Sequence, residues 1–231
     1  MTTTQFADLG IDQDLVDALS ERGITSPFDI QALTIPDGLA GRDVCGKAKT
    51  GSGKTLAFGI PLIQRLPRGT PKRPTGLALV PTRELAVQVC KELEPLAEVR
   101  GLRIEAIYGG TPIEKQIAAL TSGVDFVVAT PGRMIDLIQQ EELSVADLAG
   151  VVIDEADRMA DMGFMPQVEW ILRRAEKEHQ TLLFSATLDG MVGALISRYQ
   201  SDPVTHEVES RDVTVSEMEH RFLAVHEMDR V

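Results

Sequence analysis

Short apolar runs, each followed by a polar or glycine-rich corner and then by an amphipathic stretch, recur along this chain of 231 residues. Four runs are rich in branched side chains and lack alternating polar positions, at residues 77–80, 126–129, 151–153 and 181–184. Such runs are typical of strands buried on both faces of a parallel sheet. Weaker strand candidates lie at residues 44–48, 103–108 and 204–208.

Amphipathic segments with helical spacing separate these runs, at residues 54–66, 83–100, 112–121, 132–140, 164–177 and 190–199. Alternating strand and helix patterns predict repeated βαβ units, and therefore an α/β fold with helices on both faces of a parallel sheet. Polar residues 209–219 predict a linker, and the apolar run at 222–225 predicts the first strand of a second domain. We expect residues 1–208 to form one domain and residues 209–231 to link it to a second.

Composition excludes several classes of protein. The chain is 43% hydrophobic and 25% charged, which is ordinary for a globular domain. No apolar run approaches the roughly 18 residues of a membrane span, and the first residues lack the pattern of a signal peptide. Two cysteines, Cys45 and Cys90, predict reduced, buried thiols in the cytoplasm rather than a disulfide framework. The four histidines and two cysteines show no metal-ligand spacing.

The net charge of −12, from 23 basic and 35 acidic residues, argues by itself against a nucleic-acid partner. Its distribution weakens that argument. Residues 1–30 hold six acids and one base, and residues 201–231 hold eight acids and three bases, so each end carries −5. The middle of the chain carries only −2 and is left nearly neutral.

Residues 48–55 read AKTGSGKT, the pattern of a phosphate-binding loop with Ala48 where the first glycine usually stands. Small residues let consecutive backbone N–H groups surround phosphate oxygens, and the following helix points its positive end at them. In this pattern Lys54 neutralises the β- and γ-phosphates, and the Thr55 hydroxyl holds Mg²⁺. A simple turn before a helix is the alternative, and the position between a strand and a helix argues against it.

An acidic box, Asp154-Glu155-Ala156-Asp157, directly follows the apolar run at 151–153. Carboxylates at the end of a buried strand are costly without a cation. We therefore expect Asp154 to hold Mg²⁺ through water, and Glu155 to orient or deprotonate an attacking water. The alternative is an ordinary helix start, where acidic residues are favoured. The phosphate-binding loop earlier in the chain argues for the metal.

Four more corners stand between the predicted elements, namely PTRELA at 81–86, GG at 109–110, TPGR at 130–133 and SAT at 185–187. Because the carboxyl ends of parallel strands share one edge, we expect these corners to gather beside the phosphate-binding loop. Arg83 and Arg133 would then offer positive charge to a chain of phosphates. A proline-rich basic loop at 67–74 is open to two interpretations, a solvated connector, which is the commoner one, or a nucleic-acid contact.

In order and spacing, AKTGSGKT, PTRELA, GG, TPGR, DEAD and SAT resemble the motifs of the first RecA-like domain of a bacterial-type DEAD-box ATP-dependent RNA helicase. The resemblance covers nearly the whole chain, and residues 23–31, GITSPFDIQ, resemble the adenine-reading Q motif of that family. It implies a RecA-like α/β fold of the P-loop NTPase class. It also implies ATP and Mg²⁺ as cofactors, RNA bound through its sugar-phosphate backbone, and a second RecA-like domain as partner.

The resemblance assigns the nucleotide site residue by residue. Gln31 reads the adenine edge, since an amide pairs with N6 and N7 together. Phe6 packs on the base, and a core residue at a helix entry is the alternative. Lys54, Asp154 and Glu155 would be catalytic, with Thr55 and Asp154 at the metal. The other residues assigned to ATP belong to the phosphate-binding loop: Ala48, Thr50, Gly51, Ser52, Gly53, Lys54 and Thr55.

The resemblance also assigns contacts to the RNA backbone, from Pro81, Thr82, Arg83, Gly109, Gly110, Thr130 and Arg133. Asp157, Ser185 and Thr187 would couple hydrolysis to RNA handling. Departures from the family pattern at Lys49, Ile24, Asp29 and Ala160 touch none of the assigned roles.

The chain contains no segment like the His-Arg-x-Gly-Arg motif that supplies arginine fingers from the second domain of this family. We therefore expect these residues alone to be monomeric, to bind adenine nucleotide and RNA weakly, to hydrolyse ATP barely, and not to unwind RNA. Two alternative functions remain open: a DNA-directed P-loop ATPase, and a non-catalytic ATP-dependent RNA clamp or scaffold.

Overall fold

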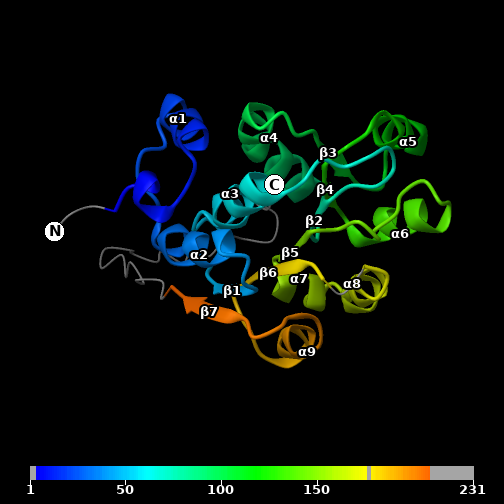
Figure 1. Ribbon diagram of the computed structural model, residues 1–231. Helices are drawn as coiled ribbons and strands as arrows, with labels where there is room; N and C mark the ends of the chain where they lie inside the picture. Colours follow the sequence, from blue (N-terminus) through cyan, green and yellow to red (C-terminus); the bar gives the residue numbers. More distant parts are fainter. Residues whose placement is uncertain (1–3, 176–177, 209–231) are drawn as a thin grey trace, which may run out of the picture.

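A computed structural model describes residues 4–175 and 178–208, and it contains one seven-stranded parallel sheet in the order β3-β4-β2-β5-β6-β1-β7 (Figure 1). All seven predicted strands are present, and each neighbouring pair is parallel. The strands are β1 (Val44–Lys47), β2 (Gly76–Leu79), β3 (Ile104–Ile107), β4 (Phe126–Ala129), β5 (Gly150–Asp154), β6 (Gln180–Ser185) and β7 (Val204–Glu207). The predicted linker, residues 209–231, lies outside the described residues.

Helices cover both faces of the sheet (Figure 1), which confirms the predicted α/β class. One face carries α1 (Gln13–Glu21), α2 (Asp29–Leu39), α3 (Lys54–Arg65) and α4 (Arg83–Val99). The other carries α5 (Ile113–Ser122), α6 (Pro131–Gln139), α7 (Ala156–Asp161), α8 (Met165–Leu172) and α9 (Gly190–Tyr199). Among the described residues, no helix has both the length and the apolar character that a membrane span requires.

The core explains why the strand runs lack polar alternation. In β2, Leu77 and Leu79 pack beneath α5–α9, whereas Ala78 points into the cluster beneath α1–α4. All three side chains are fully buried. Because both faces of the strand meet an apolar layer, every position along it favours an apolar side chain.

Six of the helices were predicted, although the one expected at 164–177 ends at Leu172. The sequence did not predict α1, α2, α7 or the short 3₁₀ turn η1 (Phe6–Leu9). Helix α2 contains Pro36 and Gly38, two residues that normally signal a turn. Its helical form is stabilised by close packing on α3, since a Cβ on Gly38 would lie only 2.9 Å from the ring of Pro61.

The basic loop at 67–74 is held by ion pairs to neighbouring segments. Arg73 donates to both carboxylate oxygens of Asp147 at 2.6 Å, and Lys72 lies 2.6 Å from Glu142. Arg68 donates to the Gly101 carbonyl. With their charges matched locally, these side chains favour the connector interpretation of the loop over a nucleic-acid contact.

Cys45 in β1 is fully buried, as predicted, whereas Cys90 in α4 is half-buried. Burial, and then the charge of Asp43, raises the pKa of Cys45 from 9.0 to about 11. Its thiol lies 2.7 Å from Oε1 of Gln200. Because the unfolded chain loses this proton first, the contribution of Cys45 to stability is constant below pH 9 and falls as the pH rises from 9 to 11.

We predict that Cys45 reacts with iodoacetamide at pH 8 at least about 100-fold more slowly in the native chain than in guanidinium, because only the thiolate reacts. The measurement is mass spectrometry of the peptide containing Cys45 over a time course. The chain unfolded in guanidinium is the control. Equal rates in the two states would show that β1 exposes its thiol.

Candidate functional site

All the corners singled out in the sequence lie along the carboxyl edge of the sheet, because every strand runs in the same direction. Strand order sorts them into two groups. The loop at 48–55, the acidic box and SAT follow the adjacent strands β1, β5 and β6, and we call this the phosphate-loop half. PTRELA, GG and TPGR follow β2, β3 and β4, and we call this the arginine half. The two halves meet between β2 and β5.

The phosphate-binding loop joins β1 to α3 through two glycines in the left-handed region, Gly51 at φ +84° and Gly53 at φ +86°. A Cβ on Gly53 would lie 2.5 Å from the Gln31 amide nitrogen, so the close approach also requires glycine. The Ser52 hydroxyl is buried and finds no hydrogen-bond partner among the described residues. A buried donor that is left unpaired in a loop of this pattern suits a bound phosphate.

Lys54 is 7% exposed and folds back onto its own loop. Its Nζ donates to the Ala48 carbonyl at 3.3 Å and lies 3.9 Å from Oδ1 of Asp154. Burial raises the pKa of Asp154 to about 6, against the opposing influence of Lys54. Asp154 also accepts a hydrogen bond from the Glu155 N–H at 2.9 Å. The amine and the carboxylate therefore stabilise each other at the position where a phosphate and its counter-ion would bind.

Both carboxylate oxygens of Glu155 are engaged. Thr50 Oγ1 donates to one at 3.2 Å, and Arg158 Nη1 donates to the other at 3.1 Å. Glu155 is 6% exposed and has φ +51°, a left-handed conformation that costs a non-glycine residue about 1 kcal/mol or more. Arg158 was not predicted, because a basic residue in the turn after an acidic box is also an ordinary helix feature.

Ser185 links the acidic box to the phosphate-binding loop. Its Oγ accepts hydrogen bonds from the N–H groups of Asp157 at 3.1 Å and Thr187 at 3.4 Å. Its carbonyl accepts from the Ala48 N–H at 3.0 Å. The Asp157 carboxylate in turn accepts from the Ala186 N–H at 3.3 Å. A single buried residue at the end of β6 thus contacts both of the corners that flank it in the sheet.

We predict that Ser185→Ala lowers the free energy of unfolding by about 0.5–1.5 kcal/mol, because it removes the acceptor of the hydrogen bond from the N–H of the half-buried Asp157. Thr187→Ala is the matched control, since Thr187 is exposed, and it should change stability by less than about 0.5 kcal/mol. Urea denaturation at equilibrium measures both. Equal effects of the two substitutions would contradict the structural role given to the Ser185 hydroxyl.

Gln31 is 2% exposed and lies at the start of α2. Its Oε1 accepts from the Phe28 N–H at 2.9 Å, and its Nε2 donates to the Gly53 carbonyl at 2.9 Å. A side-chain amide has a second N–H and a second lone pair, so a two-point contact with a base edge remains chemically available.

Phe6 is also 2% exposed and packs in the core, as the helix-entry alternative expects.

Thr55 lies in the first turn of α3, facing α4. Burial raises the pKa of Glu92, and a hydrogen bond with the Thr55 side chain opposes that shift. A hydroxyl that donates to a carboxylate keeps its lone pairs for a metal ion. The predicted metal role of Thr55 is therefore compatible with this contact.

In the arginine half, the two predicted arginines differ in their surroundings. Arg83 is exposed and lies 4.9 Å from the centre of the Tyr108 ring. Arg133 is only 11% exposed, and it donates to Gln116 at 2.9 Å and to the Thr111 carbonyl at 3.1 Å. Arg133 thus braces the loop that contains Gly109 and Gly110, while Arg83 presents its charge to solvent.

The remaining predicted residues of this half also lie at the edge. Thr82 begins α4, where its hydroxyl accepts from the Leu85 N–H at 3.2 Å. Pro81 is buried, Thr130 is half-buried, and Gly109 and Gly110 are exposed. Tyr108, Thr111 and Gln116 were not predicted, since none belongs to a recognisable local pattern.

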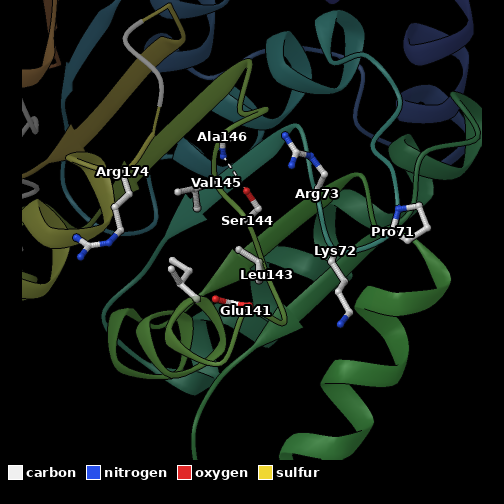
Figure 2. A pocket seen from close by; sticks show the side chains of 10 residues that line it. Pro71, Lys72, Arg73, Glu141, Leu143, Ser144, Val145, Ala146 and Arg174 are labelled. Atoms are coloured by element: carbon white, nitrogen blue, oxygen red, sulfur yellow. Dashed lines mark hydrogen bonds between the residues drawn. The ribbon is translucent and has the colours of Figure 1, made fainter.

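A pocket of about 430 Å³ lies at the opposite, amino edge of the sheet (Figure 2). It is lined by residues that precede β2 and β5, together with Arg174, whose guanidinium stacks on Trp170. The lining side chains Lys72 and Arg73 are paired with acidic residues, as described above. No corner of the candidate site contributes to this pocket.

Comparison with known proteins decides the family. Residues 28–194 match the family described as DEAD/DEAH box helicase, over more than half of the chain. The chain belongs to the DEAD/DEAH box helicase family. The predicted resemblance to DEAD-box proteins is thereby confirmed. The RecA-like fold is confirmed by the parallel sheet and by the solved structure described next.

Individual relatives agree with this membership. The chain is 42% identical over 227 residues to a "DEAD-box ATP-dependent RNA helicase CshA" of Bacillus licheniformis and 40% identical to one of Bacillus subtilis, in each case over 97% of the chain. A crystal structure of a DEAD box protein from Methanococcus jannaschii is similar, with a TM-score of 0.82 and 37% identity over 89% of this chain and 56% of that one. The chain spans about half the length of the curated relatives, 46% and 45%.

Proposed function

We propose that the chain is the ATP- and RNA-binding N-terminal RecA-like domain of a DEAD-box RNA helicase. The whole protein would couple ATP hydrolysis to local separation of RNA duplexes in the cytoplasm. One observation carries the proposal, namely that Ser185 hydrogen-bonds to both the phosphate-binding loop and the acidic box on adjacent strands. The relatives, named as ATP-dependent RNA helicases, support the choice of substrate.

In the proposed ATP site, Gln31 orients the base, and the loop N–H groups and Lys54 bind the phosphates. Thr55 and Asp154 would hold Mg²⁺, which commonly takes one or two protein ligands together with substrate phosphates. When bound, the metal neutralises charge that develops on the phosphate oxygens. Lys54 must leave the Ala48 carbonyl to reach a phosphate, and Glu155 must free an oxygen from Thr50 or Arg158 to orient a water.

In the proposed RNA site, the exposed Arg83 contacts a backbone phosphate, while Arg133 holds the Gly109–Gly110 corner in place. Pro81, Thr82 and Thr130 complete the contact with the sugar-phosphate chain. Asp157, Ser185 and Thr187 lie on the nucleotide side of the edge and would transmit its state to the arginine half. A second RecA-like domain is the proposed partner and would supply an arginine finger.

The nucleotide assignment is tested by isothermal titration of this chain with ATP and GTP. We expect ATP to bind at least about tenfold more tightly than GTP, since Gln31 pairs with an adenine edge. Lys54→Ala should abolish detectable binding of both, while Lys49→Ala, in the same loop, should keep the preference for ATP. Equal affinity for ATP and GTP would argue for a different P-loop ATPase.

We predict that this chain alone hydrolyses ATP at least about 10³-fold more slowly than the whole protein does with RNA, because an arginine finger contributes roughly 10³–10⁵ in rate. A coupled phosphate-release assay with and without RNA measures both proteins. Turnover by the isolated chain at the rate of the whole protein would contradict the proposal that a second domain supplies the arginine finger.

The clamp or scaffold alternative is tested in the whole protein by Glu155→Gln. We expect this substitution to lower turnover by at least about 100-fold, with nucleotide affinity changed by less than about threefold, because the amide cannot accept a proton from water. Asp161→Asn, which makes the same change of carboxylate to amide at an exposed position of α7, is the matched control and should leave turnover unchanged. Unchanged turnover would favour the scaffold, and stimulation by DNA equal to that by RNA would favour a DNA-directed ATPase.

A further inference from the structure

The guanidinium of Arg83, exposed at the first position of α4, lies over the ring of Tyr108. Across the residues that the structure describes, no carboxylate pairs with this guanidinium and no oxygen accepts a hydrogen bond from it. Arg133 differs, because it donates to Gln116 and to the Thr111 carbonyl. A guanidinium over a ring uses its charge in that contact rather than its N–H groups. The five N–H donors of Arg83 are therefore available to an anion.

Tyr108 lies directly after β3, and both its backbone and its ring are held in place. Its carbonyl accepts hydrogen bonds from Nε2 of Gln116 at 3.0 Å and from Oγ1 of Thr111 at 3.4 Å. Gln116 is itself buried. The half-buried ring of Tyr108 packs against the apolar cluster beneath α1–α4. The ring is therefore a fixed surface on which a mobile side chain can rest.

The contact between the two side chains joins corners that β4 separates in the sheet. Arg83 follows β2 and Tyr108 follows β3, and the order of the strands here is β3-β4-β2. The glycine corner lies beside the same guanidinium, since a Cβ built on Gly110 would stand 4.0 Å from Nη1 of Arg83. An exposed arginine without a partner samples many rotamers. A ring that holds the guanidinium in one place reduces the entropy lost when a phosphate binds.

We propose that Tyr108 is a positioning residue for RNA binding, whose ring holds the Arg83 guanidinium where it meets a backbone phosphate. The inference rests on the proposed RNA site and adds to it a residue that acts through Arg83. The free energy of a cation over an aromatic ring at an exposed site corresponds to about a two- to fivefold change in an equilibrium constant. Loss of the ring should therefore change RNA affinity by a factor of that size.

The test measures binding of a single-stranded RNA to the whole protein with a non-hydrolysable ATP analogue, by fluorescence anisotropy at fixed salt. Tyr108→Leu keeps an apolar side chain for core packing but has no aromatic face, so it should weaken binding about two- to fivefold. Tyr108→Phe keeps the aromatic face and should retain wild-type affinity. Tyr199→Leu, the same change at the C-terminal end of α9, is the matched control and should leave RNA affinity unchanged.

A double-mutant cycle separates positioning from a structural role. Arg83→Gln should weaken RNA binding and reduce the slope of log affinity against log salt by about 0.7, the value for one phosphate contact on a single strand. In the Arg83→Gln background, Tyr108→Leu should have no further effect, because the ring has no guanidinium to hold. All variants should bind ATP as the wild type does, which shows that they are folded.

Three results would overturn the inference. The first is wild-type RNA affinity in Tyr108→Leu. The second is an equal loss from Tyr108→Leu in the wild-type and Arg83→Gln backgrounds, which would give the ring a structural role or a direct contact with RNA. The third is wild-type RNA affinity in Arg83→Gln, which would leave the RNA site to other residues. A wild-type protein that binds ATP but no RNA would instead reject the proposed function, and the inference with it.

Discussion

The parallel pairing of β6 with β5 on one side and β1 on the other is the constraint on which the rest of the site depends. In this register Lys47 lies opposite Ser185, and Asp154 lies opposite Phe184, so the three strands end at nearly the same level. The phosphate-binding loop, the acidic box and SAT leave the sheet at that level. A shift of one residue in the pairing of β6 with β5 would turn the Ser185 side chain to the other face of the sheet, away from the Asp157 N–H that now donates to it, because side chains alternate between faces along a strand.

Each buried charge of the phosphate-loop half has a partner, Lys54 opposite Asp154 and Arg158 beside Glu155. Lys54, Asp154 and Glu155 are each less than a tenth exposed, and their contacts are with the loop, with one another, or with Thr50 and Arg158. Buried charge that is paired this way is tolerated, whereas removal of one member leaves the others uncompensated. A nucleotide that enters the site must therefore exchange existing contacts for new ones, and its net affinity is the difference between them.

The strands and six helices followed from local pattern, because buried runs and amphipathic spacing are properties of neighbouring residues. Strand order is different. The division of the edge into two halves depends on β2 lying beside β5 and β4, and no residue in β2 encodes that choice locally. For the same reason the sequence identified Arg133 but not the bracing contacts with Thr111 and Gln116 that leave it 11% exposed. Helix α2 was missed because Pro36 and Gly38 look like a turn until α3 packs against them.

The sheet also sets the distance between the phosphate-binding loop and the arginine half. Strands β1 and β2 are separated in the sheet by β6 and β5, and neighbouring strands lie about 4.8 Å apart, so the two strands are roughly 14 Å apart. Helices cover both faces of this sheet, and the packed layers leave it little freedom to stretch. The spacing between the phosphate-binding loop and the arginine half is thus a fixed property of the fold. A conformational change in one half can therefore reach the other only through the loops at the carboxyl ends of the strands, because the distance between the strands does not change.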